Sequence, residues 1–197
     1  MMKQYLAYGV LAVLLSAATL LILYPALWDD TPVPGLAGAF LYELETAREH
    51  TAFTALLLAS APAIRIDVPV LGVDAAVIAD TFGEPRGADR AHEGVDIFAS
   101  RGTYVVSATD GIIARTGTNG LGGTIVFVLG PGGERYYYAH LDEIDPLLSM
   151  GQRVSTSTIL GRVGTTGNAT GTPPHLHFGI YGNGGALDPY ARLMSRI

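Results

Sequence analysis

Two histidines occupy alternate positions in residues 171–178, Gly-Thr-Pro-Pro-His-Leu-His-Phe. Successive side chains of a β-strand point to opposite faces, so His175 and His177 share one face, while Leu176 and Phe178 share the other. Imidazole nitrogens are common zinc ligands. The spacing therefore predicts half of a metal site on one face of a strand, with the opposite face turned to a core.

A second segment, residues 92–96 (His-Glu-Gly-Val-Asp), supplies two more side chains that could bind a metal. In an extended chain His92, Gly94 and Asp96 share a face, and the glycine leaves room for an ion between the imidazole and the carboxylate. The same alternation directs Glu93 away from the metal. We therefore do not assign Glu93 the role of general base.

Together, His92, Asp96 and His177 make a set of three protein ligands. Catalytic zinc sites have three protein ligands and one open position, whereas structural zinc sites are closed by four. The chain has no cysteine, which excludes thiolate ligands, a cysteine nucleophile and disulfides. The set predicts one catalytic zinc ion bound by two histidines and one aspartate.

The charge balance limits the possible partners. The chain has 12 Lys and Arg residues against 18 Asp and Glu residues, a formal net charge of −6. No basic stripe is available to neutralise phosphates, so the composition argues against nucleic-acid binding. An anionic polymer would have to be held by local contacts.

An apolar N-terminal segment precedes the elements that carry these residues. Tyr5 to Leu27 contains no charged residue, and about 20 such residues suffice to cross a bilayer as a helix. Lys3 precedes this segment, while Asp29 and Asp30 follow it, which favours an N-terminus inside and a C-terminus outside.

A cleaved signal peptide is the alternative for this segment. Its apolar core would be unusually long, and residues 24–28, Tyr-Pro-Ala-Leu-Trp, offer no small-x-small cleavage site. We therefore predict an uncleaved transmembrane anchor over residues 1–28.

Residues 29–63 are predicted to form a linker and a juxtamembrane helix. Apolar residues recur at near-helical spacing between 36 and 60, at Phe40, Leu44, Ala47 and Leu58. Charged side chains cluster in its first half, at Glu43, Glu45, Arg48 and Glu49. A second membrane span is disfavoured, because burying this cluster in lipid is costly.

From residue 64 onward the pattern changes to short β-rich runs separated by glycine, asparagine and aspartate turns. Ile64, Ile66, Val68 and Val70 alternate, and the later runs cover residues 94–98, 103–108, 111–116, 124–129, 135–140, 159–163 and 175–181. Strands at this spacing without intervening helices predict a mainly β domain built on an antiparallel sheet over residues 64–197.

Three blocks in order carry a family resemblance: His92-x-x-x-Asp96, Tyr138-Ala139-His140-Leu141 and His175-Leu176-His177-Phe178. Together they resemble the signature of the lysostaphin-type zinc metallopeptidases, the M23 family. The segments Phe82-Gly83-Glu84-Pro85-Arg86 and Gly161-Arg162-Val163-Gly164 also fit. The resemblance covers about residues 77 to 190.

The resemblance implies an antiparallel β-domain with a narrow groove that hydrolyses peptide cross-links of bacterial peptidoglycan. It implies that His92, Asp96 and His177 hold one zinc ion per chain, which activates a water. His140 and His175 would be the catalytic pair, aiding water activation and oxyanion stabilisation, with their roles undivided. With the anchor, it implies a single-pass protein of the bacterial cytoplasmic membrane with its C-terminal domain outside the cytoplasm.

Two departures from the family pattern concern the shape of the groove. Ser157 stands where a glycine is common, and the loop between Arg86 and His92 is short. Strand alternation also places Tyr136 and Tyr138 on the face of His140. There they would either line the groove or pack in a core.

Two other functions fit the same residues. Some M23-like relatives lack ligands and act as non-catalytic scaffolds or activators of other cell-wall hydrolases. The presence of all five site residues argues against that alternative. A binding module that keeps zinc but recognises wall peptides without turnover is the second.

Overall fold

The computed structural model describes residues 35–87 and 89–194. Its strands are β1 (Val95–Phe98), β2 (Tyr104–Val106), β3 (Gly111–Asn119), β4 (Gly123–Leu129), β5 (Arg135–Ile144), β6 (Arg153–Val154), β7 (Ile159–Val163), β8 (His175–Gly182) and β9 (Gly185–Leu187). Its helices are α2 (Gly35–Ala59) and α3 (Tyr190–Leu193), with short 3₁₀ turns η2 (Ala75–Val77), η3 (Pro131–Gly133) and η4 (Gly167–Ala169).

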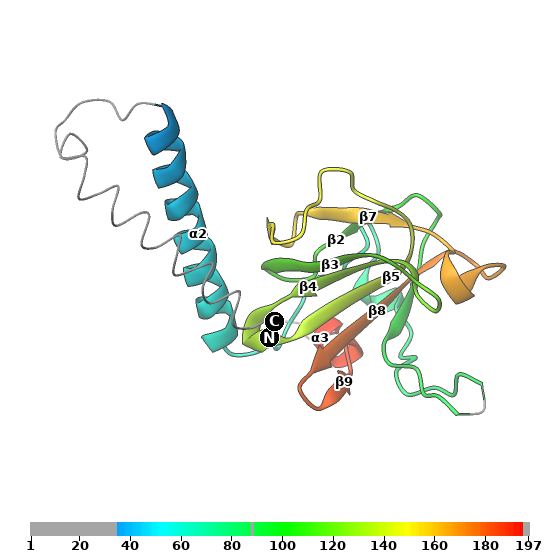
Figure 1. The fold of residues 1–197 in the computed structure, drawn as a ribbon. Helices are drawn as coiled ribbons and strands as arrows, with labels where there is room; N and C mark the ends of the chain where they lie inside the picture. The colour runs from blue at the N-terminus through cyan, green and yellow to red at the C-terminus, as the bar shows by residue number, and fades with distance from the viewer. Residues whose placement is uncertain (1–34, 88, 195–197) are drawn as a thin grey trace. The chain divides into compact units, whose positions relative to one another are not determined.

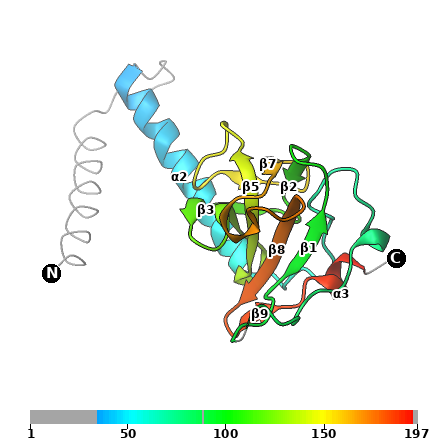
Figure 2. The same cartoon turned by 90° about the vertical axis from the view of Figure 1, so that its right-hand side faces the viewer.

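The strands form one antiparallel sheet in the order β1-β8-β5-β4-β3-β6. Figure 1 labels its central strands β8, β5, β4 and β3. Strand β7 pairs with β2 and β5, and β9 pairs with β8. The N-terminal β1 therefore lies beside the C-terminal β8 (Figure 2). The predicted antiparallel sheet is confirmed, and this pairing brings the His92–Asp96 and His175–His177 motifs together.

Most strands begin and end close to the predicted runs, because their apolar residues alternate between turn glycines. Strands β6 and β9 were not predicted, since two or three residues are too short to show an alternating pattern. The alternating Ile64–Val70 segment forms no strand and makes a single bridge, between Val70 and Val105.

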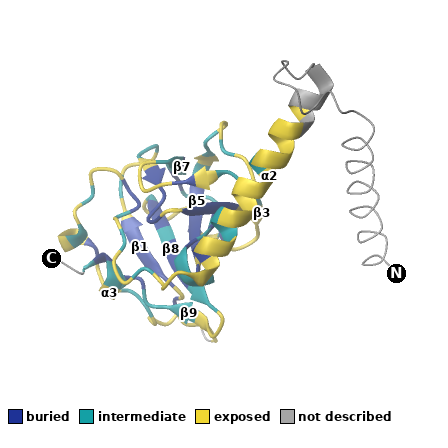
Figure 3. Ribbon diagram, turned by 90° about the vertical axis from the view of Figure 1, so that its left-hand side faces the viewer, coloured by how far each residue is buried: buried dark blue, intermediate teal, exposed yellow. Residues whose placement is uncertain are grey.

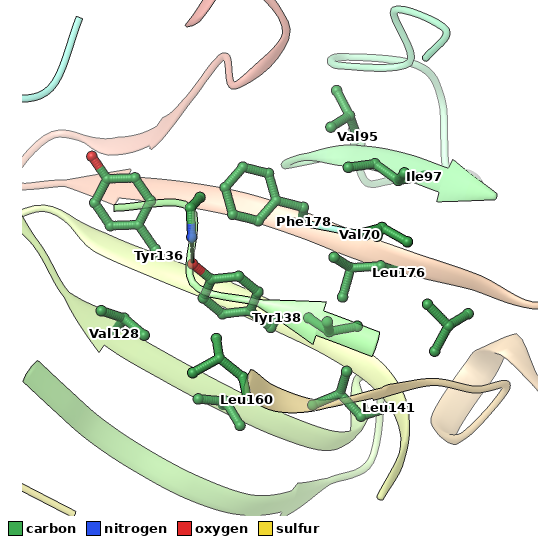
Figure 4. Packing of buried hydrophobic residues seen from close by; sticks show 14 of the residues in the cluster. Val70, Val95, Ile97, Val128, Tyr136, Tyr138, Leu141, Leu160, Leu176 and Phe178 are labelled. Atoms are coloured by element: carbon green, nitrogen blue, oxygen red, sulfur yellow. Dashed lines mark hydrogen bonds between the residues drawn. The ribbon is translucent and has the colours of Figure 1, made fainter. Parts of the chain in front are cut away.

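One face of the sheet carries the hydrophobic core. Tyr136, Tyr138, Leu176 and Phe178 are completely buried and lie on the same side of their strands (Figure 4). Figure 3 shows the buried residues gathered along the central strands. Burying each side chain of this size contributes about 1.5–3 kcal/mol.

The prediction that Tyr136 and Tyr138 share the face of His140 is wrong. The register of β5 against β4 shifts between Tyr138, which pairs with Val126, and Leu141, which pairs with Thr124. Two β5 residues, Ala139 and His140, thus oppose one β4 residue, which is a β-bulge. His140 has φ 62°, and it is the only non-glycine with positive φ among the described residues.

This bulge turns His140 to the face opposite the two tyrosines. Tyr136 and Tyr138 are fully buried in the core, while Tyr137, Ala139 and His140 line the opposite side. An L-residue in the left-handed region is uncommon and concentrates at functional sites.

Helix α2 covers nearly the same residues as the helix predicted over 36–60. The predicted transmembrane anchor, residues 1–28, lies outside the described residues. Within residues 35–87 and 89–194, no helix has the length and apolarity needed to cross a membrane.

Candidate metal centre

The face of the sheet opposite the core is hollowed into a groove of about 940 Å³. Along β8 the side chains alternate between the two faces. His175, His177 and Tyr181 line the groove, while Leu176 and Phe178 lie in the core. The groove also receives His92 and Asp96 from the β1 side and His140 from β5.

Three ligand-type atoms converge at the groove floor. His92 Nε2 lies 2.8 Å from His177 Nδ1, and Asp96 Oδ1 lies 3.1 Å from the first atom and 3.2 Å from the second. All three side chains are buried or nearly so. Among the described residues, this is the one group of His, Asp and Glu side chains arranged to hold a metal ion.

The donor set fits zinc. In a tetrahedral site with bonds of about 2.0–2.1 Å, neighbouring ligand atoms lie about 3.3 Å apart, close to the three separations seen here. Two imidazoles and one carboxylate also match the three-ligand pattern of catalytic zinc. The residues predicted from the two motifs would therefore hold the ion.

Neighbouring groups orient the ligands. His92 Nδ1 lies 2.7 Å from the carbonyl oxygen of Thr81 and 2.9 Å from the guanidinium of Arg86, and these two contacts hold the ring with Nε2 toward Asp96. Arg86 donates to Asp96 Oδ2 at 2.5 Å, which leaves Oδ1 facing the histidines. Neither Thr81 nor Arg86 was predicted to act here.

The electrostatics favour the protonation states that bind metal. Burial raises the pKa of Asp96, but hydrogen bonds from His177, His92 and Arg86 outweigh it and bring the net pKa far below its usual range. Burial lowers the pKa of His177 and favours the neutral imidazole. A carboxylate and neutral imidazoles are the forms that coordinate a cation.

Gly94 allows the two motifs to approach. A Cβ on this residue would lie 2.9 Å from Cε1 and 3.0 Å from Nε2 of His177, and still closer to the carbonyl oxygen of Phe178. Gly94 was predicted to leave room for an ion, but the structure shows that the β8 backbone and the His177 ring occupy this room.

The two remaining histidines flank the ligands without joining them. Rings of His140 and His175 are 5.1 Å apart, and His140 lies 5.8 Å from the His177 ring, all between centroids. Each directs Nδ1 to a backbone carbonyl, Thr166 at 2.9 Å for His140 and Pro173 at 2.8 Å for His175. Both therefore carry the proton on Nδ1 and have Nε2 free for chemistry.

Burial also favours the neutral form of the His140 imidazole. It lowers the pKa of His140 to about 4, so the neutral ring is present at neutral pH. A neutral imidazole with Nδ1–H can accept a proton or a hydrogen bond at Nε2. His175 Nε2 lies 3.9 Å from Asp96 Oδ1, which is too long for a hydrogen bond.

Two further groove residues, Tyr137 and Glu93, lie near the metal-ligand set without belonging to it. Tyr137 lines it next to His177, with ring centroids 5.9 Å apart, because alternation on β5 sends Tyr137 to the face opposite Tyr136 and Tyr138. Glu93 lies at the exposed rim and forms a hydrogen bond with Tyr181. Both contacts are outside the metal-ligand set.

Comparison with known proteins identifies the family to which this chain belongs. The model of peptidase family M23 matches residues 90–189, slightly more than half of the chain and including all five site histidine and aspartate residues. The chain belongs to peptidase family M23. This family is zinc-dependent, in agreement with the donor set described above.

Named relatives and solved structures share the peptidase domain. The L-Ala–D-Glu endopeptidase of Bacillus subtilis (strain 168) is 36% identical over 124 residues, 57% of this chain and 38% of the relative. The peptidoglycan DD-endopeptidase ShyC of Vibrio cholerae is 34% identical over 98 residues, 50% of this chain and 22% of the relative. The chain therefore spans well under half the length of these relatives.

The fold is also that of a solved peptidase. The catalytic domain of lysostaphin, an antimicrobial peptidase from Staphylococcus simulans, superposes with a TM-score of 0.54 at 32% sequence identity. The match covers 60% of this chain and 92% of the lysostaphin domain. The β-domain therefore has the lysostaphin-like fold of family M23.

Proposed function

We propose that this protein is a zinc metalloendopeptidase that hydrolyses peptide cross-links of bacterial peptidoglycan. The observation that supports it best is the convergence of His92 Nε2, Asp96 Oδ1 and His177 Nδ1, with two further histidines facing the same point of an open groove. The names of the relatives support the substrate class, since they include a peptidoglycan endopeptidase.

When bound, the zinc ion would act as a Lewis acid that polarises the scissile carbonyl and lowers the pKa of a water molecule. The protein's own groups supply proton handling. His140, neutral because it is buried, accepts a proton at Nε2. His175, held by the Pro173 carbonyl, presents its Nε2 to the same region. The two histidines bracket the position where the peptide bond would lie.

The test uses the full 197-residue chain and purified peptidoglycan. Released peptides are separated and identified by mass spectrometry, with and without a chelator, and after zinc is restored. We expect peptide release that stops with the chelator and returns with zinc. Release of equal amount by His177→Ala would overturn the proposal.

The same experiment distinguishes the alternatives. A non-catalytic scaffold would release nothing alone but would raise the activity of a second hydrolase added to the reaction. A zinc-binding recognition module would retain zinc and pellet with peptidoglycan without any cleavage. In both cases the loss of His140 would leave the measured property unchanged.

The proposal includes the location of the protein. The uncharged segment Tyr5–Leu27 and the charge asymmetry around it support a single-pass anchor in the bacterial cytoplasmic membrane, with the peptidase domain outside the cytoplasm. Protease added to spheroplasts should then degrade the domain while a cytoplasmic marker survives. Protection of the domain until the cells are lysed would contradict this location.

A further inference from the structure

Among the described residues, the groove carries one permanently charged side chain on the part of its floor formed by β3, β4, β5 and β8, that of Arg115 on β3. The charged side chains that line it are Arg86, Asp89, Arg90, Glu93, Asp96 and Arg115. Arg86 pairs with Asp96, and Glu93 bonds to Tyr181. Asp89 and Arg90 lie on the loop before β1 and not on the sheet. Arg115 lies apart from these on β3, and among the described residues its guanidinium group forms no hydrogen bond and no ion pair.

Arg115 lies at the end of a row of side chains across the sheet. It pairs with Phe127 of β4, Phe127 pairs with Tyr137 of β5, and Tyr137 pairs with Gly179 of β8. Of the groove residues contributed by these four strands, Arg115 is the one with a permanent charge.

The row connects directly to the metal centre. The rings of Phe127 and Tyr137 stack with centroids 4.5 Å apart, and the Tyr137 ring meets the ring of the metal ligand His177 edge-on at 5.9 Å. Arg115 is also close enough to Tyr137 to interact with it electrostatically. The floor therefore runs from the metal centre over two aromatic rings to a guanidinium group.

Resting on the proposed function, we infer that Arg115 is a specificity-determining residue that binds a carboxylate of the substrate peptide. An unpaired guanidinium group recognises a carboxylate through two parallel hydrogen bonds, and the aromatic rings between offer an apolar surface for the intervening peptide. Because the whole chain has net charge −6, an anionic peptide gains nothing from the long-range field. A local positive group is needed to hold it.

Strand spacing sets the position of this carboxylate. From β8, which carries His177, to β3 there are three inter-strand steps, about 14 Å in all. An extended peptide covers that distance in about four residues. The structure therefore assigns to the substrate a carboxylate group about four residues from the cleaved bond.

The probe is purified peptidoglycan in two forms. One form keeps its free carboxylates, and the other is treated with a carbodiimide and ammonium chloride, which converts them to amides. The full chain is tested as wild type, Arg115→Gln, Arg115→Lys and Arg65→Gln. The last variant removes the same charge from an exposed residue outside the groove.

Two readouts are compared. The first is the rate of peptide release with zinc present, at limiting substrate. The second is co-sedimentation with peptidoglycan in the presence of a chelator, which reports binding without cleavage. We expect wild type and Arg65→Gln to prefer the free-carboxylate form about three- to tenfold in both readouts, as for one partly solvated ion pair. Arg115→Gln should lose this preference, and Arg115→Lys should keep part of it.

The outcomes separate the two hypotheses. Cleavage without any preference for free carboxylates, or a preference that survives in Arg115→Gln, overturns the role of Arg115 and leaves the proposed function intact. Absence of cleavage together with carboxylate-dependent binding that needs Arg115 overturns the proposed function and supports the binding role. Equal sedimentation of all variants with both forms overturns the binding role by itself.

Discussion

The imidazole Nδ1 of His140 donates to the carbonyl oxygen of Thr166 over 2.9 Å. The hydroxyl of Thr166 in turn donates to the carbonyl of Leu141 at 2.8 Å and accepts from the backbone N–H of Thr124 at 2.9 Å. Thr166 therefore joins β4 and β5 where the bulge places His140. We infer that it fixes both the backbone and the tautomer of that histidine.

Replacing Thr166 by valine tests the contribution of its two hydroxyl hydrogen bonds, because the shape of the side chain is kept. Valine keeps the shape but loses both hydroxyl hydrogen bonds, so we expect unfolding free energy to fall by about 1–3 kcal/mol. Because a displacement of about 1 Å in a catalytic group can reduce the rate 100-fold, the rate of peptide release should fall at least about tenfold. Release kinetics and urea denaturation measure the two effects.

Thr166→Ser is the matched control, since it keeps the hydroxyl group. It should retain most of the activity, and zinc content should be the same in both variants. If Thr166→Ser is as inactive as Thr166→Val, the hydroxyl hydrogen bonds are not the cause. Nitrogen NMR of His140 should show a proton on Nδ1 in wild type and a mixture of tautomers in the valine variant.

The bulge explains which site residues could be predicted from the sequence. His175 and His177 were placed on one face because a regular strand has a fixed period of two. That period fails at His140, because the extra residue in β5 changes which face of the sheet its side chain occupies relative to the preceding residues. Tyr136 and Tyr138 therefore lie on the face opposite His140. A positive φ at a histidine leaves no pattern in a single sequence.

Contacts between residues far apart in the chain could not be predicted from the sequence either. Nothing in the chain indicates that Arg86 bonds to Asp96, or that Arg115, Phe127 and Tyr137 form one row, because these contacts depend on strand register. The antiparallel sheet could be predicted, since turn glycines and alternating residues recur along the chain. Pairing of β1 with β8 required the structure.

Gly94→Ala should weaken metal binding while the domain remains folded. The added methyl group would strike the carbonyl of Phe178 and the ring of His177, so the ring or β8 must move. Displacing one of three ligands should weaken zinc affinity at least about tenfold. Zinc per chain after dialysis, and competition with a coloured chelator, measure the loss.

Gly184→Ala is the control for this substitution, because a Cβ there meets no atom within 4 Å. It should bind zinc like the wild type. Circular dichroism should show the same strand content in both variants. Normal zinc content in Gly94→Ala would show that the groove adapts and that the close approach is not required.

Substituting the two histidines of β8 should have different effects. His177→Ala removes one ligand atom of the converging set, so we expect zinc content near zero and no peptide release. His175→Ala removes a side chain outside that set and should keep zinc at the wild-type level. Its rate of release should fall about 100-fold, as when one group that stabilises the transition state is lost.

Metal analysis and release assays on the same protein samples decide between these outcomes. Loss of zinc in His175→Ala would place that residue among the ligands. Retention of zinc in His177→Ala would remove it from them. His50→Ala, on helix α2 and remote in sequence from both motifs, controls for the general effect of losing an imidazole.

Alkaline pH should destabilise the domain through Tyr138. The ring is completely buried, and its hydroxyl accepts a hydrogen bond from the backbone N–H of Ala108 at 2.9 Å (Figure 4). Burial raises the pKa of Tyr138 from 10.0 to about 12, so the fold favours the neutral phenol. Its contribution is complete below pH 10 and is lost as the pH rises through 12, about 3 kcal/mol in all.

Tyr138→Phe should therefore change the pH dependence of stability as well as its value. At pH 7 the variant loses the hydrogen bond to Ala108, which costs about 1–3 kcal/mol. Its urea midpoint should fall less steeply than that of wild type between pH 10 and pH 12, since the remaining slope comes from Tyr136, Tyr137 and Tyr181, whose pKa values are also raised. Parallel curves for the two proteins would mean that Tyr138 ionises equally in the folded and unfolded chains. The exposed Tyr42→Phe should match the wild type at every pH.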